Sequence, residues 1–374
     1  MELLKQKKVL ISGASFAGLS TAYWMRKLGY HVTVVEIAKG LKKGGTPVNI
    51  IENTVGIVKR MGLFDQIQSN KITMKSMEFK NSDDVTERLA PIKRDGEQCA
   101  EGEYEVERDV LLNLLFEAVK DDVEFIFGES VVSLMEDDNG VDVGFKGGQK
   151  RSFDLVFGCD GIHSAVRKYW FGEETEFSHF LQTYFSIAIV NRLLIPENTT
   201  QMYNEPGKMV MMNAYNNKTD IVLCFFSEKE IPYDYRNEEE QRNIILNRFS
   251  GTGWRTPELL EEMKNSKTFY FDKLCQMKMP SWTKGRVALV GDAGYCASPA
   301  AGRGGSLAID GAAALADAFQ KCHGNFELAF REYNERFRPF IEEVQANAVN
   351  FGVEFLVPRT AEAIRKRNAQ TIPF

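Results

Sequence analysis

The apolar runs and short polar breaks of the first 36 residues predict a strand, a helix and a second strand. Val9 to Ser12 is a short apolar run, and Leu19 to Leu28 has the spacing of a helix that ends at Gly29. His31 to Glu36 is rich in β-branched residues, which favour strands. This order predicts a βαβ unit whose two strands are parallel and whose second strand ends on an acid.

Shorter elements are predicted as far as about residue 160. Asn139-Gly140 lies between two apolar segments and indicates a tight hairpin. Residues 41–49 are basic and contain glycine, so we expect a loop there. The expected helices span 54–61 and 109–119, and the expected strands span 104–108, 124–127, 130–136, 141–145 and 153–159.

The pattern changes after about residue 175, where the segments 185–190, 209–213 and 221–226 are typical of antiparallel strands. A polar helix is expected at 238–249. After residue 325, apolar positions recur every three or four residues and predict a long helix, which Pro339 should kink or restart. The expected fold class is α/β in two lobes, with a Rossmann-like parallel sheet, an inserted and mostly antiparallel sheet, and C-terminal helices.

The composition of the chain excludes several classes of protein and of binding partner. The 374 residues are 44% hydrophobic and 26% charged, which is ordinary for a globular protein. The net charge of -6 disfavours nucleic acid as a partner, and no apolar run approaches the ~18 residues of a membrane span. The N-terminus has no signal-peptide pattern, so a cytoplasmic location is expected. The scattered cysteines and histidines favour reduced thiols and no metal site.

A glycine-rich turn, Gly13-Ala14-Ser15-Phe16-Ala17-Gly18, joins the first two elements. Gly13 permits a tight turn, the small Ser15 permits close approach of a pyrophosphate, and Gly18 permits packing of helix on strand. Glu36 would accept hydrogen bonds from ribose hydroxyls and repel a 2′-phosphate, which favours FAD or NAD over NADP. A glycine turn in some other α/β fold is the alternative.

A second glycine-rich bend follows an apolar strand almost a whole chain later. Residues 287–290 lead into Gly291-Asp292-Ala293-Gly294, and Pro299 and Gly302-Arg303-Gly304-Gly305-Ser306 precede an alanine-rich helix. Free N–H groups and the helix dipole suit an anionic or polar ligand at such a bend. The two turns together predict one long ligand that is bound at both ends.

A third segment, Cys159 to Arg167, also follows a strand and opens a helix. Asp160 or Ser164 can cap that helix, so a structural role and a functional role are equally compatible with the segment. His163 has no obvious acid partner in the sequence, and we interpret it as structural or incidental.

These segments, in this order, resemble the FAD-dependent aromatic hydroxylases (class A flavoprotein monooxygenases, with a para-hydroxybenzoate hydroxylase-like fold). That family combines a G-x-G-x-x-G turn and a following Glu, an Arg on a later strand, a D-G-x-x-S-x-x-R segment, and a late G-D-A…P…G-x-G segment. The corresponding residues here are Gly13 to Gly18, Glu36, Arg108, Asp160 to Arg167, and Gly291 to Gly305. Within the family, Lys43-Gly44-Gly45-Thr46-Pro47 and the helical tail are most similar to the tetracycline-inactivating monooxygenases.

The resemblance implies a discontinuous FAD-binding domain. Its segments would be 1–70, 100–174 and 281–325, with a substrate-binding domain at 71–99 and 175–280 and C-terminal helices at 326–374. By the same resemblance, Glu36 binds the adenosine ribose, Arg108 reaches the ribityl–phosphate region, and Asp292 contacts the ribityl chain or the pyrophosphate. The residues implied to bind FAD are Gly13, Ser15, Phe16, Ala17, Gly18, Glu36, Ile37, Lys43, Gly45, Asn49, Arg108, Asp160, Gly291, Asp292, Pro299, Gly302, Gly304, Gly305 and Ser306.

The activity that the resemblance implies is monooxygenation. NADH or NADPH, as a transient co-substrate, would reduce FAD, O2 would form a flavin C4a-hydroperoxide, and one oxygen atom would pass to an aromatic or polycyclic small molecule. The protein would supply binding and electrostatics and no catalytic side chain, although an inward Arg303 would stabilise the reduced flavin; a solvated Arg303 is the alternative. The expected assembly is a monomer.

We expect the substrate to lie between the flavin and the inserted sheet. The candidate region comprises Tyr184, Phe185, Met211, Met212, Phe225 and Phe226. Aromatic and methionine side chains suit a flat polycyclic molecule, although such residues on strands more often belong to the core.

Four positions depart from the family pattern. Ser15 replaces the middle glycine, Arg303 stands where Gln is common, and Ser306 stands where Asn is common. Asn49 occupies the place of an Asp in the tetracycline enzymes, which argues against tetracycline itself as the substrate, although a tetracycline-like antibiotic stays a candidate. The alternatives are an FAD-dependent reductase of the same fold, an NAD-dependent dehydrogenase that uses only the first turn, and a non-catalytic flavoprotein that sequesters a polycyclic ligand.

Overall fold

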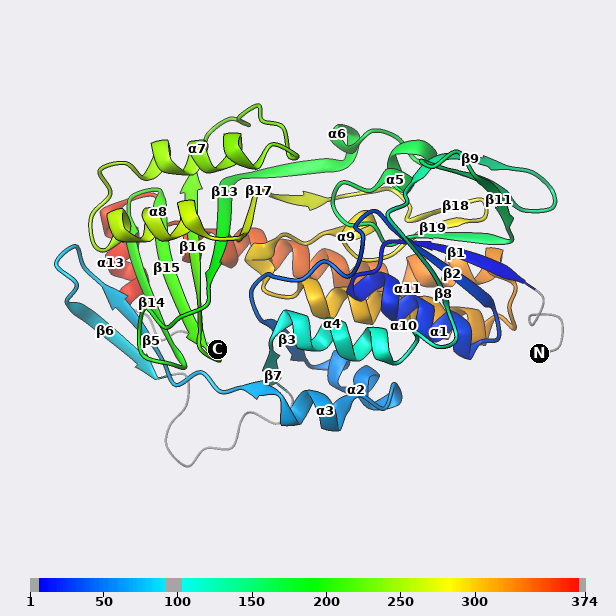
Figure 1. Cartoon of the computed structure of the whole chain (residues 1–374), viewed down its shortest axis with the longest axis horizontal. Helices are drawn as coiled ribbons and strands as arrows, with labels where there is room; N and C mark the ends of the chain where they lie inside the picture. Colours follow the sequence, from blue (N-terminus) through cyan, green and yellow to red (C-terminus); the bar gives the residue numbers. More distant parts are fainter. Residues whose placement is uncertain (1–6, 92–102, 370–374) are drawn as a thin grey trace.

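The computed structural model describes residues 7–91 and 103–369. Figure 1 shows two lobes side by side along the long axis. We call the lobe around a six-stranded sheet the first lobe and the lobe around a seven-stranded sheet the second lobe. The chain enters the second lobe twice, because strands from residues 76–91 and 178–277 share the seven-stranded sheet.

The six-stranded sheet has the strand order β18-β19-β12-β1-β2-β8. Its strands are β1 (Lys8–Ser12), β2 (His31–Glu36), β8 (Glu124–Phe127), β12 (Leu155–Gly158), β18 (Thr283–Lys284) and β19 (Val287–Leu289). All neighbours are parallel except β18 and β19. The apolar run of β12 is buried throughout, as a central strand of a parallel sheet requires. The predicted βαβ unit is confirmed.

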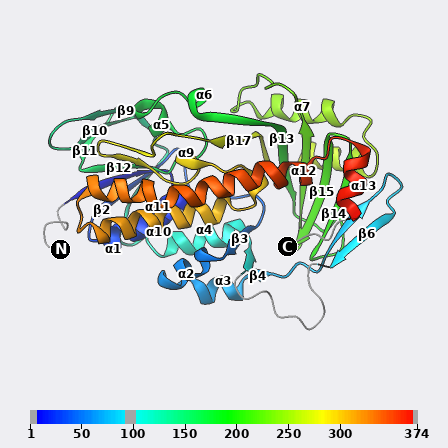
Figure 2. The same ribbon diagram turned by 180° about the vertical axis from the view of Figure 1, so that it is seen from behind.

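Helices cover one face of this sheet (Figures 1 and 2). The helices of the first lobe are α1 (Phe16–Lys27), α2 (Asn53–Arg60), α3 (Phe64–Ser69), α4 (Arg108–Glu117), α5 (Ala165–Trp170), α6 (Glu174–Phe177), α9 (Asp292–Tyr295) and α10 (Gly304–Lys321). Helix α10 packs along α1, so the two glycine turns begin neighbouring helices. An antiparallel sheet of β9 (Val131–Glu136), β10 (Val141–Phe145) and β11 (Lys150–Phe153) contains the predicted hairpin at Asn139-Gly140.

The seven-stranded sheet has the order β17-β13-β16-β15-β14-β5-β6. Its strands are β5 (Ser76–Lys80), β6 (Thr86–Pro91), β13 (Ser178–Val190), β14 (Thr199–Glu205), β15 (Lys208–Tyr215), β16 (Lys218–Phe226) and β17 (Thr268–Met277). Helices α7 (Glu238–Phe249) and α8 (Thr256–Asn265) pack on one face through Ile245 and Leu259. The predicted antiparallel strands and polar helix of this region are confirmed.

A small sheet of β3 (Val48–Ile51), β7 (Glu103–Val106) and β4 (Lys71–Ile72) lies between the lobes (Figure 1). One of its faces joins the main core of the first lobe through Val48, Ile50 and Val106. The expected loop 41–49 is therefore wrong at its end, because the β-branched and apolar residues after Pro47 pair with β7.

Helix α11 (Phe326–Asn347) runs along the back from the first lobe towards the second (Figure 2). Pro339 lies inside α11, so the expected restart there is wrong. The helix continues because Phe337 and Ile341 bury their side chains on either side of the proline. Near its end, the Gln345 amide donates hydrogen bonds to the Met277 and Cys296 carbonyl oxygens at 2.9 and 3.1 Å. The tail then forms a π-helical turn (Ala348–Gly352), α12 (Val353–Leu356) and α13 (Ala361–Ala369).

Several boundaries differ from the sequence prediction. The expected strand 104–108 ends at Val106, and Arg108 begins α4. Helix α1 begins at Phe16, three residues before the first apolar residue of the expected run, because the glycine turn leads directly into it. The expected strand 153–159 divides into the end of β11 and the separate β12. Within residues 7–91 and 103–369, no helix is long and apolar enough to cross a membrane.

Candidate FAD and substrate site

The first glycine turn joins β1 to α1 and leaves no room for side chains at its glycines. Gly13 has a φ of 104°, and a Cβ there would lie 2.4 Å from the Cys159 carbonyl oxygen. A Cβ at Gly18 would lie 1.8 Å from the Gly13 carbonyl oxygen. Larger residues would force α1 away from β1 and β12. The first N–H groups of α1 have no partner inside the helix and are available to an anionic ligand.

Glu36 ends β2 and directs its carboxylate to the same turn. Its oxygens accept hydrogen bonds from the Ala14 N–H at 2.8 Å and the Ala38 N–H at 2.9 Å. These two contacts fix the orientation of the carboxylate while its other lone pairs stay available to ribose hydroxyls. A cavity of about 250 Å³ is lined by the predicted residues Gly13, Ser15, Glu36, Ile37, Arg108 and Asp160.

Arg108 begins α4 and reaches across this cavity. Its guanidinium donates to the Ser15 hydroxyl at 3.1 Å and to the Lys42 carbonyl oxygen at 3.2 Å, and it lies 4.9 Å from the centre of the Phe16 ring. Burial lowers the pKa of Arg108, and nearby acids including Asp109 oppose that shift. An arginine stays charged at neutral pH, so this guanidinium places a cation where a pyrophosphate would meet the head of α1.

Asp160 follows β12 and is bound mostly by its own segment. Its carboxylate accepts hydrogen bonds from the Ala165 N–H at 2.9 Å, the Val166 N–H at 3.1 Å and the Ser12 hydroxyl at 3.2 Å. Ser164 is the N-cap of α5, and its hydroxyl accepts the Arg167 N–H at 3.0 Å. Both capping roles are thus present, and Asp160 also lines the cavity.

The second glycine bend packs directly on the first. Gly291 has a φ of 71°, and a Cβ there would lie 3.0 Å from the Ala17 Cβ in α1. Asp292 begins α9 with an accessible side chain, yet the surrounding protein raises its pKa by desolvation, and the Cys296 thiol and Arg108 only partly oppose this shift. An accessible carboxylate with so little internal hydrogen bonding is suited to accept ligand hydroxyls.

The start of α10 is fixed against β3. Pro299 opens a short 3-10 turn (Pro299–Ala301), and Gly302 follows with a φ of 65°. A Cβ at Gly305 would lie 2.1 Å from the Val48 side chain. The buried Ser306 donates its hydroxyl to the Asn49 carbonyl oxygen at 2.5 Å. Ser306 therefore holds α10 to β3, and the backbone of Gly304 and Gly305 is what a ligand would meet.

Arg303, the N-cap of α10, is bound by an acid of the first lobe. Its guanidinium forms a two-point ion pair with Glu52 at 2.8 and 2.9 Å. This pair disfavours the expected inward orientation of Arg303, because the guanidinium is already engaged within the protein. The sequence offered no sign of the pairing, because the partner lies 251 residues away.

The glycine pair of the 43–47 loop is shaped by contacts on both lobes. Gly45 has a φ of 110°, and a Cβ there would lie 2.6 Å from the Arg108 side chain. A Cβ at Gly44 would lie 2.7 Å from Thr268 at the start of β17, in the second lobe. Lys43 is exposed in the same loop. The loop therefore closes one side of the space between the lobes.

His163 has two acid partners, so the interpretation that it lacks one is wrong. Its Nδ1 lies 2.8 Å from the Glu174 carboxylate and its Nε2 lies 3.4 Å from the Asp272 carboxylate. Burial alone would lower the pKa of His163, but Asp272 and Glu174 together raise it to about 9. The ring also stacks on Tyr235 at a centroid distance of 4.5 Å. Asp272 and Tyr235 belong to the second lobe, so His163 joins the two lobes.

The six residues of the predicted substrate region do not form one wall. Tyr184, Met212 and Phe225 belong to the core under α7 and α8. Phe185, Met211 and Phe226 belong to the opposite face of the seven-stranded sheet. Alternation along each strand places adjacent residues on opposite faces, so three of the six face away from the first lobe.

The wall that faces the first lobe contains residues that sequence reasoning missed. Beside the predicted Met211, Ile187 of β13 is partly exposed on this face. Tyr270 of β17 is 39% exposed, with its ring centre 5.5 Å from that of Phe185. The Tyr270 hydroxyl donates to Asp272 at 2.9 Å. The two-residue alternation of β13 and β17 is the signal that could have identified them.

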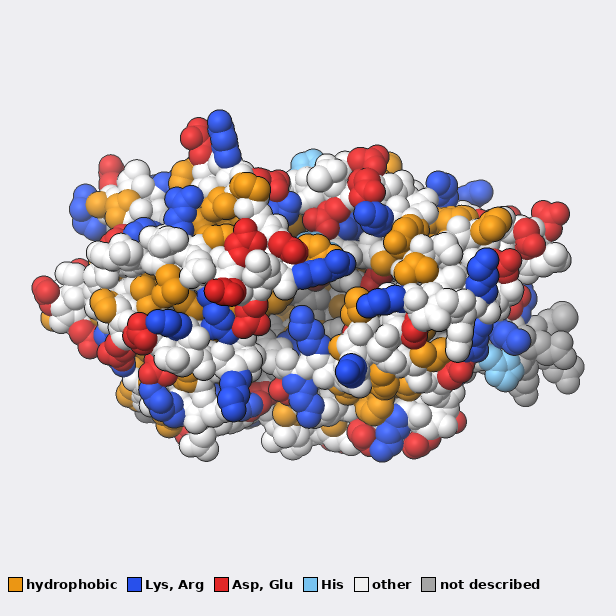
Figure 3. Space-filling model, turned by 45° about the horizontal axis from the view of Figure 1, so that its top comes forward, with side chains coloured by type: hydrophobic (Ala, Val, Ile, Leu, Met, Phe, Trp, Pro, Cys, Tyr) orange, Lys and Arg blue, Asp and Glu red, His pale blue; other side chains and the backbone are white. Residues whose placement is uncertain are grey.

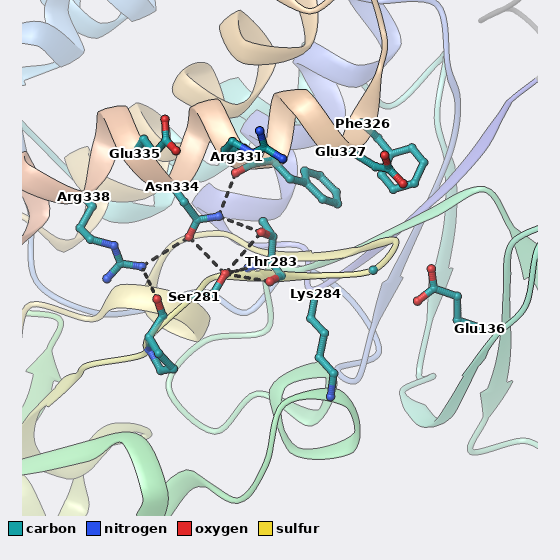
Figure 4. Close-up of a pocket in the computed structure, with 13 residues that line it drawn as sticks. Glu136, Ser281, Thr283, Lys284, Phe326, Glu327, Arg331, Asn334, Glu335 and Arg338 are labelled. Carbon is teal, nitrogen blue, oxygen red and sulfur yellow. Dashed lines mark hydrogen bonds between the residues drawn. The ribbon is translucent and has the colours of Figure 1, made fainter.

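The surface is hollowed between the two lobes, and both basic and acidic side chains lie around the hollow (Figure 3). A different groove, of about 540 Å³, lies between α11 and β18 (Figure 4). There the Asn334 side chain accepts the Trp282 N–H at 2.9 Å and donates to the Thr283 hydroxyl at 2.8 Å. None of the glycine turns lines this groove, so we assign it no part in the site.

The chemistry of the site fits FAD. The paired turns at Gly13 and Gly291 would offer backbone N–H groups to a pyrophosphate, and Arg108 would supply a cation. Glu36 and Asp292 would supply acceptors for the ribose and the ribityl chain. The two turns lie against each other, so one extended dinucleotide can contact both.

Comparison with known proteins agrees with this chemistry. Residues 6–347 match the family model described as FAD binding domain. A flavin-dependent monooxygenase of Legionella longbeachae is 34% identical over 358 residues, covering 94% of this chain and 90% of that protein. The protein Rv1260 of Mycobacterium tuberculosis is 36% identical over 346 residues, covering 91% of this chain and 92% of the relative. The crystal structure of the tetracycline destructase Tet(51) has a TM-score of 0.86 at 33% identity, covering 97% of this chain and 94% of that one.

The resemblance inferred from the motifs and the α/β fold class are thereby confirmed. The match of the FAD binding domain extends over most of the chain, and the relatives cover nearly its full length. The chain belongs to the FAD-dependent aromatic hydroxylase family of flavin monooxygenases and is an FAD-dependent oxidoreductase.

Proposed function

We propose that this protein uses NADH or NADPH and O2 to add one oxygen atom to an aromatic or polycyclic small molecule. The observation that carries the proposal is that the second glycine bend packs on the first, which lines a cavity together with Glu36, Arg108 and Asp160, in a chain of the flavin monooxygenase family. Bound FAD would supply the electron transfer and the activation of dioxygen.

The side chains of the first lobe would bind and orient the cofactor. Glu36 would hold the adenosine ribose, Arg108 the phosphates, and Asp292 the ribityl chain. The backbone N–H groups of Gly304 and Gly305, at the head of α10, would stabilise negative charge on the pyrimidine edge of the flavin. None of these groups needs to exchange a proton with the substrate.

The second lobe, with the predicted segments 71–99 and 175–280, would bind the substrate. Its wall of Ile187, Met211 and Phe185 is apolar, and Tyr270 adds an aromatic edge. Such a wall suits a flat ring system and keeps water from the reacting atoms. The structural neighbour Tet(51) is named a tetracycline destructase, which supports a polycyclic substrate; we propose a tetracycline-like molecule as one member of the class.

The test begins with the cofactor. Purified protein should be yellow and should release FAD on denaturation. NADH and NADPH oxidation and O2 uptake are then measured with a panel of polycyclic phenols, tetracyclines included, and each product mass is determined. Stimulation together with a product heavier by one oxygen atom would support the proposal.

Other outcomes would exclude it. A colourless protein that binds NAD would point to a dehydrogenase. A yellow protein that binds a polycyclic ligand and returns it unchanged, without O2 uptake, would point to sequestration. A product that is reduced and not oxygenated would point to a reductase of the same fold.

A further inference from the structure

The small sheet between the lobes has one face that does not pack into the core of the first lobe. Val48, Ile50 and Val106 point into the core of the first lobe. Side chains alternate along a strand, so Asn49 and Glu105 lie on the opposite face. They are direct partners in the β3–β7 register, which places their Cβ atoms about 5 Å apart. Asn49 is exposed and Glu105 is partly exposed.

This face is turned to the second lobe. Ile72 of β4 pairs with Glu105 and packs with Met74 and Tyr215, which belongs to β15. Lys218, the first residue of β16, pairs with Tyr215 and forms an ion pair with Glu107 at 2.7 Å. Glu105 therefore lies where β7 approaches the end of β15 and the start of β16 in the seven-stranded sheet.

Glu105 also borders the wall assigned to the substrate. Near Glu105, three neighbouring strands of the seven-stranded sheet place one cross-strand row of residues. This row contains Asn213, Asp220 and Ile189, which are direct neighbours in register. This row lies on the same face as Met211 and Ile187, because each pair is two residues apart along its strand. An apolar wall with a few convergent polar groups at one end is the usual form of a small-molecule site.

The groups that face Glu105 do not neutralise it. Asp220 is fully buried, and both its carboxylate oxygens accept the Tyr215 hydroxyl at 3.0 Å. Lys218 is engaged by Glu107, and β3 and β4 present the uncharged Asn49 and Ile72. Within residues 7–91 and 103–369, the Glu105 carboxylate has no hydrogen-bond or ion-pair partner.

Burial raises the pKa of Glu105 to about 7. Burial also raises the pKa of Asp220 to about 7, and Glu105 adds to that shift while Lys218 opposes it. A carboxyl group that titrates near neutrality can accept a proton and release it within a catalytic cycle. Such a group has no task in holding FAD.

We propose that Glu105 accepts the proton of a ring hydroxyl on the substrate, with the Asn49 amide donating a hydrogen bond to the oxygen that remains. This inference rests on the proposed monooxygenase function. In the step, the substrate O–H bond breaks, its electron pair stays on oxygen, and an O–H bond forms on Glu105. No electron is gained or lost. The proton returns to the product oxygen before release.

The step has a clear chemical use. A phenolate or enolate releases electron density into its ring, and the ring carbons that accept an oxygen atom become more nucleophilic. The two neighbouring carboxyl groups also disfavour a substrate that carries its own carboxylate. The substrate class is therefore an uncharged phenol or enol on a flat apolar ring system.

The variant that tests this step is Glu105→Gln, which keeps the shape of the side chain and removes the base. The first probe is 7-hydroxycoumarin, a flat phenol without a carboxylate. For wild type, kcat/KM for substrate-dependent NAD(P)H oxidation should rise as the pH passes about 7. In Glu105→Gln this rise should be lost, and kcat at about pH 8 should fall by ~100-fold or more.

A second measurement does not depend on turnover. The absorbance of 7-hydroxycoumarin bound to the oxidised holoenzyme reports its ionisation. Wild type should ionise the bound phenol at a lower pH than free phenol, and Glu105→Gln should not. Glu105→Asp keeps a carboxylate, so it should keep the pH dependence at a reduced rate. Glu103→Gln alters an exposed residue of the same strand and should behave as wild type.

The outcomes separate this inference from the function on which it rests. Wild type that oxygenates phenols, with Glu105→Gln unchanged in rate and pH profile, overturns only the role of Glu105. A preference for 4-hydroxybenzoate over 7-hydroxycoumarin overturns the substrate class. Holoenzyme that oxygenates no phenol or enol overturns both proposals. Equal FAD content in all variants excludes misfolding as the cause of a loss.

Discussion

At the scale of single residues, the two charged groups of the late glycine bend have opposite surroundings. Asp292 has an accessible carboxylate with little internal hydrogen bonding and a pKa raised by desolvation. Arg303, eleven residues later, is bound at two points by Glu52. A group that is bound within the protein is not available to a ligand, so we expect Asp292, and not Arg303, to contact FAD.

Asp292→Ala should lose FAD while Arg303→Gln keeps it. Loss of a hydrogen bond to a charged group costs about 1.5–3 kcal/mol, which corresponds to ~10–100-fold weaker FAD binding. The Arg303–Glu52 pair lies near the surface, so its loss should cost under about 1 kcal/mol of folding stability. FAD titration of apo-protein by flavin fluorescence measures both. Unchanged affinity in Asp292→Ala would refute its role.

At the scale of elements, the position of α10 depends on its contact with β3. Gly305 lies against Val48, while a Cβ at Gly304 would meet no protein atom within 4 Å. The Ser306 hydroxyl adds a hydrogen bond to the same strand. The two adjacent glycines therefore have different roles. Gly305 permits close packing on β3, and Gly304 faces the proposed ligand.

Gly305→Ala should destabilise the apo-protein by about 1–3 kcal/mol, because the added methyl group has no space beside Val48. Gly304→Ala is the matched control and should leave apo-protein stability nearly unchanged. Urea unfolding of both apo-proteins measures the difference. Equal stability of the two variants would contradict the packing argument.

At the scale of the whole molecule, His163 is a point where the lobes meet. It lies between Glu174 of the first lobe and Asp272 of the second, and Asp272 also accepts hydrogen bonds from Tyr233 at 2.7 Å and Tyr270 at 2.9 Å. The cluster keeps a charged imidazole in a partly buried place, so its contribution to stability depends on pH.

The folded-state pKa of His163, about 9, lies above the ordinary value of 6.5. The stabilisation from its ion pairs is therefore fully present below about pH 6.5 and is lost as the pH rises through 9. Its full size is roughly 3 kcal/mol. His163→Gln should lower stability at about pH 6 and flatten its decline towards pH 9, as urea unfolding across pH measures. His179→Gln, at an exposed histidine, is the control; the same flattening there would contradict the assignment.

Much of the first lobe was predictable because its signals are local. The backbone at Gly13 and Gly291 needs positive φ, the β-branched run 31–36 favours a strand, and the acid at its end lies beside the turn in any βαβ unit. The sheet of the second lobe was also predicted, but the face of the sheet on which each side chain lies was not. The register that turns Tyr184 inward and Phe185 towards the first lobe follows from pairing with distant strands.

The sequence by itself determined the cofactor and the fold family of this protein, because a glycine turn, a following acid and a capped helix are set by neighbouring residues. Only the tertiary structure decided what each charged side chain does. Glu52 forms an ion pair with Arg303, Asp272 gives His163 an acid partner, and Asn49 and Glu105 meet on one face of a small sheet. Those partners lie from 56 to 251 residues apart, and only folding brings their atoms within range.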